Sequence, residues 1–159
     1  MPETMFASRT SQLDDLLALI CEELQLPPAK YKLAEDRYVA VGRWLEAVGS
    51  SLKPWQPIIY PQGSFRIGTT VAPIGRAEFD LDLVVEMLRC PSDTPPSSVL
   101  NMVDARLREH QTYKNMVERK KRCVRLEYAG DFHLDILPAR PERSSSTTGV
   151  WIPDRELHT

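Results

Sequence analysis

Residues 78–87 read EFDLDLVVEM, and this stretch decides how the rest of the chain is interpreted. Polar and apolar residues alternate over its first six positions, and successive side chains of a strand point to opposite faces. The alternation gives one acidic and one apolar set: Glu78, Asp80 and Asp82 against Phe79, Leu81 and Leu83. We therefore predict a strand with one face in a hydrophobic core and the other face acidic.

Asp80 and Asp82 stand two residues apart, which places their Cα atoms ~7 Å apart on one face of a strand. Side chains that lean together can bridge two cations at the ~3.5–4 Å separation of two-metal phosphoryl-transfer sites. Mg²⁺ prefers hard oxygen ligands, which carboxylates and substrate phosphates supply. An acidic pair taken alone is more often the solvated face of a strand, so this alternative stays open.

Asp135 lies within FHLDILPA, residues 132–139, where its neighbours are apolar. A charge inside so apolar a strand needs a partner or a metal. Alternation puts His133 and Asp135 on one face, so a neighbouring strand would bring Asp135 beside the acidic pair. The alternative is an ion pair between Asp135 and an arginine such as Arg122 or Arg125.

The segment GSFRIGTT, residues 63–70, follows a predicted strand and is rich in small residues. Small residues let backbone N–H groups approach phosphate oxygens, and such nests bind anions. The candidate nucleotide-binding residues are Gly63, Ser64, Arg66 and Thr69, with a hydroxyl donor at Ser64 and a neutralising charge at Arg66. A Gly-Ser pair alone is a weak signal. Its position shortly before the acidic strand predicts that phosphates and metals share one cleft.

The remaining pattern predicts an α+β (mixed α/β) fold, with a mixed sheet packed against helices. The predicted elements are helices over 11–25, 29–48 and 97–111 and strands over 57–61, 78–87, 122–128 and 132–137. The first helix carries a stripe that we expect to be buried: Leu13, Leu16, Leu17, Ile20 and Leu24. Gly49 and Ser50 are expected to cap the second helix, and Pro138 to end the last strand.

Composition indicates one ordinary globular domain over 1–159. It comprises a helical segment over 1–50, a catalytic sheet over 56–138 and a polar tail over 139–159. The net charge of −2 and pI near 5.9 argue against a nucleic-acid-binding protein. The basic run at 118–125 is better interpreted as a solvated strand edge. Three widely spaced cysteines, no signal peptide and no long apolar stretch favour a cytoplasmic protein without membrane contact.

The run QGSFRIGTTVAPIGRAEFDLDLVVEM, with FHLDILPA downstream, resembles the polymerase-β-type nucleotidyltransferase superfamily. The hallmark of that superfamily is a Gly-Ser pair, an alternating strand with two aspartates, and a third aspartate on a later strand. More closely, the chain resembles the bacterial CD-NTases, relatives of cyclic GMP-AMP synthase and oligoadenylate synthase. Its GSFRIGT, EFDLDLV and GVWIPDRE segments carry this resemblance, which runs from about Tyr31 onward.

The resemblance implies a polymerase-β-like nucleotidyltransferase core and a role for each motif residue. Gly63 and Ser64 would hold the donor triphosphate, and Asp80 and Asp82 would bind two Mg²⁺ ions, for which Mn²⁺ can substitute. Asp135 would bind the catalytic metal and help activate the acceptor hydroxyl, which attacks the α-phosphate and releases pyrophosphate. The products in this family are cyclic oligonucleotides, second messengers that activate an effector in anti-phage defence.

Members of the family also have a helical C-terminal lobe, and we expect this lobe to be absent from the present chain. The chain would then be a truncated product, or a partner chain would complete the cleft. Two other functions stay open. One is nucleotidyl transfer to a protein, a tRNA or a small molecule, and the other is an inactive remnant that binds NTP or a partner.

Overall fold

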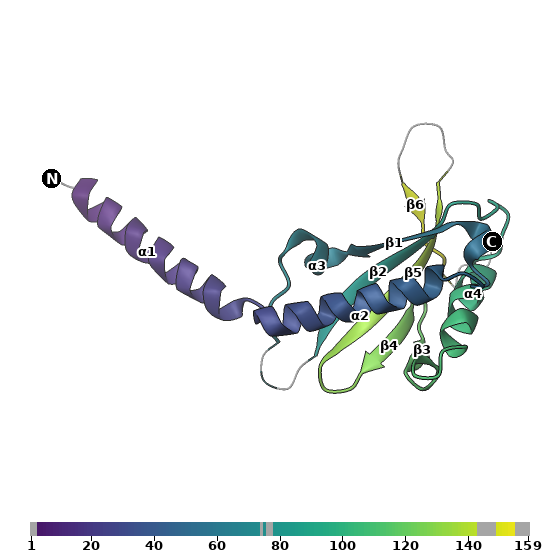
Figure 1. Cartoon of the computed structure of the whole chain (residues 1–159). Helices are drawn as coiled ribbons and strands as arrows, with labels where there is room; N and C mark the ends of the chain where they lie inside the picture. The colour runs from purple at the N-terminus through teal and green to yellow at the C-terminus, as the bar shows by residue number, and fades with distance from the viewer. Residues whose placement is uncertain (1–2, 74, 76–77, 143–148, 155–159) are drawn as a thin grey trace.

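The computed structural model describes residues 3–73, 75, 78–142 and 149–154 (Figure 1). The helices are α1 (Glu3–Leu24), α2 (Pro28–Glu46), α3 (Gly63–Ile67) and α4 (Pro96–Arg108), with short 3-10 turns at Lys53–Trp55 and Tyr113–Asn115. The strands are β1 (Pro57–Gln62), β2 (Phe79–Met87), β3 (Val117–Arg119), β4 (Val124–Tyr128), β5 (Phe132–Pro141) and β6 (Val150–Trp151).

The strands form a mixed sheet in the order β1-β2-β5-β4-β3, with β6 added to the end of β5. The central pair, β2 and β5, is parallel, whereas all other neighbouring strands run antiparallel. A parallel pair needs a long crossover, and here α4, β3 and β4 lie between its two strands in sequence. The predicted combination of a mixed sheet with helices is confirmed.

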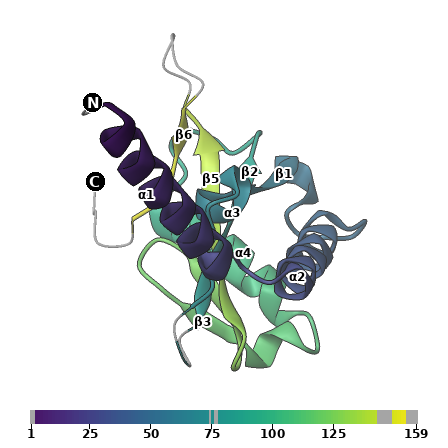
Figure 2. The same cartoon turned by 90° about the vertical axis from the view of Figure 1, so that its left-hand side faces the viewer.

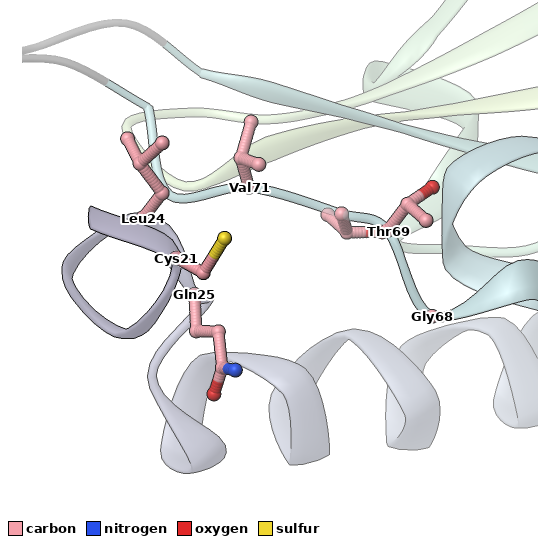
Figure 3. Close-up of a pocket in the computed structure, with 7 residues that line it drawn as sticks. Cys21, Leu24, Gln25, Gly68, Thr69 and Val71 are labelled. Carbon is pink, nitrogen blue, oxygen red and sulfur yellow. The ribbon is translucent and has the colours of Figure 1, made fainter. Parts of the chain in front are cut away.

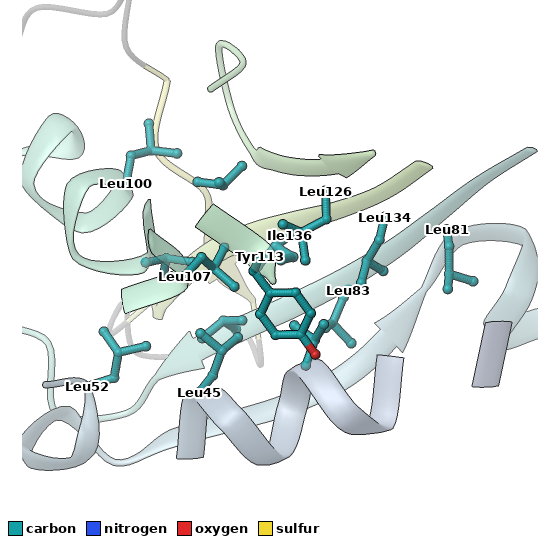
Figure 4. Close-up of a cluster of buried hydrophobic side chains, with 14 of the residues drawn as sticks. Leu45, Leu52, Leu81, Leu83, Leu100, Leu107, Tyr113, Leu126, Leu134 and Ile136 are labelled. Carbon is teal, nitrogen blue, oxygen red and sulfur yellow. The ribbon is translucent and has the colours of Figure 1, made fainter. Parts of the chain in front are cut away.

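Helices α2 and α4 lie on the same side of the sheet (Figure 2). The core side chains between helices and sheet include Leu45, Leu52, Leu81, Leu83, Leu100, Leu107, Leu126, Leu134 and Ile136 (Figure 4). The two helices are joined by reciprocal hydrogen bonds. The Trp44 indole N–H donates to the Arg106 carbonyl at 3.0 Å, and the Arg106 guanidinium donates to the Trp44 carbonyl at 2.9 Å. This pairing fixes α2 against α4 over the apolar face.

Helix α1 does not have the buried stripe that the sequence predicted. It projects from the rest of the domain (Figure 1), and the five residues of the predicted stripe keep 40% to 55% of their surface exposed: Leu13, Leu16, Leu17, Ile20 and Leu24. The helical period was right, but the hydrogen bonds that tie α1 to the rest of the domain lie at its C-terminal end, on the segment between α3 and β2. There the Ala72 N–H donates to the Leu24 carbonyl at 2.7 Å, and Gln25 bridges to Val71.

Several predicted boundaries also need correction. Helix α2 ends at Glu46, two residues before the predicted end, although the Ser50 hydroxyl does donate to the Leu45 carbonyl of its last turn at 2.6 Å. Strand β5 continues past Pro138 to Pro141, because its neighbour β2 still pairs in register with that segment and β6 pairs with its end. The sequence predicted no element at α3, β3 or β6.

Within the described residues, no helix is long and apolar enough to cross a membrane.

Candidate active site

The register of the parallel pair brings the three predicted aspartates together. Asp82 on β2 lies beside Asp135 on β5, and Asp80 lies beside His133. Their side chains point away from the core, because the intervening Leu81 and Leu134 are buried. The side chain of Asp80 is 61% exposed and that of Asp135 is 16% exposed. Alternation on two strands therefore builds one acidic surface at the centre of the sheet.

Burial raises the pKa of Asp82, and the nearby carboxylates of Asp135 and Asp80 raise it further. The positive charge of Arg125 opposes this effect but does not cancel it. A partly buried carboxylate among like charges is stabilised in its ionised form by a cation. The electrostatics of Asp82 thus match a position where a divalent ion would bind.

Arg125 supplies the cation that the aspartates hold in this structure. Its Nε donates to Asp135 Oδ1 at 2.6 Å and its Nη2 donates to Asp135 Oδ2 at 2.8 Å. The same Nη2 reaches Asp80 Oδ1 at 3.2 Å. The hydrogen bonds to Asp135 raise the pKa of Arg125 above its ordinary value. The ion pair that the sequence offered as an alternative to a metal is therefore formed, with Arg125 as the partner.

The donor set fits divalent cations, although the aspartates do not form a ready-made cage. Across the described ranges, no three His, Cys, Asp or Glu side chains are arranged to hold a metal ion as they stand. Three carboxylates nevertheless share one surface, and a guanidinium already lies between two of them. Hard oxygen ligands of this kind suit Mg²⁺, which keeps several waters and completes its shell with substrate phosphates.

Gly63 lies directly against Asp82. Its backbone has φ +65°, a left-handed conformation that L side chains rarely adopt. A Cβ added there would come within 2.5 Å of Asp82 Oδ2, far too close for any real contact. Glycine is thus favoured by the left-handed turn from β1 into α3, and any side chain there would force the Asp82 carboxylate to move.

Hydrogen bonds and aromatic packing hold the segment after Gly63 in place. Phe65 is buried and stacks on Tyr31 with ring centroids 4.4 Å apart. The Thr69 N–H donates to the Ser64 carbonyl at 2.9 Å, and the Thr70 hydroxyl donates to Ser64 Oγ at 3.1 Å. Ser64 is thereby fixed next to Gly63 at the edge of the acidic surface.

The comparisons with known proteins show the family of this chain. Residues 12–159 match the model of the SMODS family, the Second Messenger Oligonucleotide or Dinucleotide Synthetase domain. The chain belongs to this family. Over 128 residues it is 41% identical to a c-di-GMP synthase from Roseivirga ehrenbergii. This alignment covers 80% of this chain and 34% of the relative. It is 39% identical over 140 residues to the cyclic dinucleotide synthase CdnG of Bradyrhizobium diazoefficiens, covering 87% of this chain and 32% of the relative.

Solved structures show the fold of this SMODS domain. The CD-NTase CdnG of Bradyrhizobium diazoefficiens, solved in complex with GTP, superposes with a TM-score of 0.72 at 36% identity. That match covers 91% of this chain and 42% of CdnG. At the level of fold alone, the Vibrio cholerae DncV cyclic AMP-GMP synthase gives a TM-score of 0.56 at 16% identity, covering 86% of this chain and 53% of DncV. The expected polymerase-β-like core is confirmed, and the chain spans about a third of the curated relatives' length.

Two predicted nucleotide-binding residues of the SMODS domain, Arg66 and Thr69, have other neighbours than the aspartates. The Arg66 guanidinium lies over the Tyr60 ring, 5.7 Å from its centroid, and Tyr60 pairs with Val84 on the acidic side of β2. Thr69 lines a shallow hollow between segment 68–71 and the end of α1, with Cys21 opposite (Figure 3). Their roles in nucleotide binding stay predictions, as do those of Gly63 and Ser64.

Sequence reasoning placed His133 on the acidic face but missed its partners. Its Nε2 lies 2.7 Å from Glu78 Oε2, and its Nδ1 lies 3.5 Å from Asp80 Oδ1. Glu78 also accepts a hydrogen bond from the Gly130 N–H at 2.9 Å. The alternation that revealed the aspartates also puts Glu78 and His133 on one face, so the signal was present in the sequence.

Cys123 is a further neighbour of the SMODS acidic site. Burial, together with the adjacent Asp135 carboxylate, raises the pKa of its thiol to about 12. A thiol with a raised pKa is a poor nucleophile, because the thiolate is the reactive form. This agrees with the sequence interpretation of Cys123 as a packing residue.

Proposed function

We propose that this SMODS domain binds a nucleoside triphosphate with divalent cations and builds cyclic dinucleotides from it. The observation that carries the proposal is the register of β2 and β5, which sets Asp82 beside Asp135. Gly63, at the start of the segment proposed to bind phosphate, lies against the same Asp82 carboxylate. Phosphates held by that segment would therefore meet cations held by the aspartates. The names of the two curated relatives point to the same activity.

The three aspartates are the proposed cation ligands. Asp80 and Asp82 would hold two Mg²⁺ ions, with Asp135 as a further ligand of one, and Mn²⁺ is expected to substitute. Bound ions of this kind neutralise phosphate charge and stabilise the attacking and leaving oxygens of an in-line displacement. The exposure of Asp80 leaves room for the waters that Mg²⁺ retains.

The segment that begins at Gly63 is proposed to hold the donor triphosphate. Gly63 lies directly against Asp82, so phosphates bound by this segment would lie next to the proposed cation ligands. Ser64 offers its hydroxyl, which Thr70 already orients. Arg66 adds positive charge, and the Thr69 N–H keeps the segment closed on itself.

The reaction is a displacement at the α-phosphorus. An acceptor hydroxyl attacks this phosphorus, the bond to the bridging oxygen of the β-phosphate breaks, and pyrophosphate leaves. Asp135 is the proposed acceptor of the hydroxyl proton, because it lies partly shielded beside Asp82 at the centre of the acidic surface. In a second transfer the free hydroxyl of the linear dinucleotide attacks the remaining α-phosphorus, which closes the ring and releases a second pyrophosphate.

Guanine nucleotides are the proposed first substrates. One relative is named a c-di-GMP synthase, and CdnG was solved in complex with GTP. We further propose that the product acts in the cytoplasm as a second messenger, switching on an effector in anti-phage defence.

The test is pyrophosphate release and product mass from the purified chain with GTP, ATP, CTP and UTP, in Mg²⁺ or Mn²⁺. An Asp80→Ala/Asp82→Ala double variant removes the proposed cation ligands. Asp131→Asn is the matched control, because Asp131 is an exposed carboxylate in the turn between β4 and β5. We expect metal-dependent cyclic dinucleotide from the wild type and from Asp131→Asn, and none from the double variant.

Other products would point to the other functions that the sequence left open. A nucleotide attached to added protein, tRNA or a small molecule would replace the cyclase proposal with transfer to that acceptor. Metal-dependent GTP binding without pyrophosphate release would assign the chain as a binding domain. Calorimetry with GTP and Mg²⁺ separates this outcome from a chain that binds no nucleotide, which would overturn the proposal.

A further inference from the structure

We propose that Arg125 is a positioning residue that competes with the divalent cation for Asp135, and that Glu118 receives it when the cation binds. This inference rests on the proposed function, since it takes the aspartates as cation ligands. It assigns a role to a side chain that none of the motifs includes. Arg125 lies on β4, the strand next to β5, and its side chain is 21% exposed.

The grip of Arg125 on Asp135 uses both carboxylate oxygens. The contacts of 2.6 Å and 2.8 Å form a bidentate pair, the strongest geometry between arginine and a carboxylate. A third contact of 3.2 Å to Asp80 carries the guanidinium across the acidic surface. Two of the three proposed cation ligands are thus occupied by one side chain.

A divalent cation and this guanidinium cannot share Asp135 without strong repulsion. Both are positive, and both need the same carboxylate oxygens in a partly shielded position. A cation that binds Asp135 therefore has to displace at least one arm of Arg125. Arg125 in this way lowers the affinity of the site for free metal ions, so that a cation is bound best when it arrives with the negative charge of a triphosphate.

The sheet provides an alternative partner for the displaced guanidinium. In register, Arg125 has Asp135 on one side and Glu118 of β3 on the other. The positive charge of Arg125 is already close enough to contribute to lowering the pKa of Glu118, after the larger effect of the Lys120 hydrogen bond. One side chain thus lies between two carboxylates on neighbouring strands, and the displaced guanidinium would share Glu118 with Lys120, which lies 2.5 Å from it.

The experiment titrates Mn²⁺ alone, without nucleotide, into the full chain and follows free Mn²⁺ by electron paramagnetic resonance. We expect Arg125→Gln to bind Mn²⁺ about tenfold more tightly than the wild type, a typical coupling within one ion-pair network. Arg125→Lys, which keeps the charge but loses the bidentate grip, should lie between them. Glu118→Gln should bind more weakly than the wild type, because the displaced arginine loses its second partner.

Arg119→Gln is the matched control. Arg119 is an arginine on β3 that pairs with Asp104 at 2.8 Å, outside the acidic surface, so Mn²⁺ affinity should not change. Equal or weaker Mn²⁺ binding by Arg125→Gln would overturn the inference and assign Arg125 a purely structural role. If Arg125→Gln does not fold, the sign of the change in Arg125→Lys decides in the same way.

The Asp80→Ala/Asp82→Ala variant separates this inference from the proposed function. Mn²⁺ binding that is present in the wild type and absent in the double variant would support the proposed function, whatever Arg125→Gln shows. If neither the wild type nor Arg125→Gln binds Mn²⁺ better than the double variant, the aspartates are not cation ligands. That result would overturn the proposed function and this inference together.

Discussion

The two faces of β2 and β5 differ in what they bury, although the same two strands build both. On the covered face Phe79, Leu81 and Leu83 are at most 7% exposed, packed beneath α2 and α4. On the open face, one residue away along the same strand, Asp80 and Asp82 meet Asp135. The comparison teaches that stability and chemistry are separated here by the pleat of a strand. Substitutions on the two faces should therefore have different consequences.

The largest expected effect is on the open face. Asp82→Asn should lower nucleotidyl transfer by at least about 10³-fold, because losing a cation ligand removes several kcal/mol of transition-state stabilisation. The free energy of unfolding should be unchanged or slightly higher, since burial and like charges raise the pKa of Asp82 and so disfavour its ionised form. Pyrophosphate release and urea unfolding measure the two quantities. A clear loss of stability with retained turnover would contradict the separation of the faces.

The matching change on the covered face is Leu83→Ala. Leu83 is fully buried, and truncating such a leucine costs about 2–5 kcal/mol of unfolding free energy. Mn²⁺ affinity of the folded fraction should stay within about twofold of the wild type, because sites without shared partners are nearly additive. Urea unfolding and a Mn²⁺ titration below the unfolding midpoint test both parts. An unfolding free energy equal to the wild type would mean that the core does not depend on this strand.

Gly63→Ala should affect both stability and the site, because Gly63 has a left-handed backbone and also lies against Asp82. The left-handed backbone costs about 1–2 kcal/mol for a residue with a Cβ. The Cβ would also push against Asp82 Oδ2, so Mn²⁺ affinity should fall as well.

Gly49→Ala is the matched control for Gly63→Ala. Gly49 has φ +88°, and a Cβ there would meet nothing within 4 Å. It should lose stability from backbone strain alone and keep its Mn²⁺ affinity. Equal Mn²⁺ affinity in the two variants, measured side by side, would show that Asp82 moves freely away from position 63.

A charge on the covered side provides a further contrast with the open face. Burial acts to raise the pKa of Asp104, but hydrogen bonds from Arg108 and Arg119 outweigh it and leave the pKa below its ordinary value. Asp104 therefore contributes stability above pH 3.8, its ordinary pKa, and loses that contribution as the pH falls through its folded value. Asp104→Asn should lose about 1–3 kcal/mol at pH 7.

The pH dependence of unfolding checks this assignment. The difference in unfolding free energy between wild type and Asp104→Asn should shrink as the pH is lowered from 7 toward 3. Leu83→Ala is the control, because the loss of an apolar side chain should leave a difference that does not depend on pH. An Asp104→Asn difference that stays constant over this range would exclude an ionised Asp104 as the source of the stability.

Alternation predicted which side chains share the face of the candidate site, but it did not predict which strands pair. It placed Asp80, Asp82 and Asp135 on one face, because a period of two fixes the face of each side chain. It left open whether Asp135 meets a metal or an arginine, and the bidentate contact of Arg125 shows that the ion pair forms on the surface proposed for the metal. Sequence spacing does not reveal that an arginine on a neighbouring strand would compete with a cation for the same carboxylate.

The elements missed by sequence reasoning were the shortest ones. Strands β3 and β6 have three and two residues, and α3 has five, too few to show a period. They exist because their neighbours hold them, β3 and β6 as additions to longer strands and α3 through Phe65, which packs on Tyr31. The sequence pattern also did not predict the parallel pairing of β2 with β5. Alternation determines which face of a strand each side chain occupies, but not which strands pair.

The smallest expected effect belongs to α1, where the sequence predicted burial and the structure shows exposure. Leu17 is 50% exposed, so Leu17→Ala should change the unfolding free energy by less than about 0.5 kcal/mol. The period of α1 shows an apolar stripe in the same way as the period of α4, yet only α4 has a sheet beneath it. Leu107→Ala on α4 is the matched comparison and should cost about 2–5 kcal/mol. If urea unfolding gave equal losses for the two leucines, the stripe of α1 would have to be covered in solution, and the contrast between the two helices would disappear.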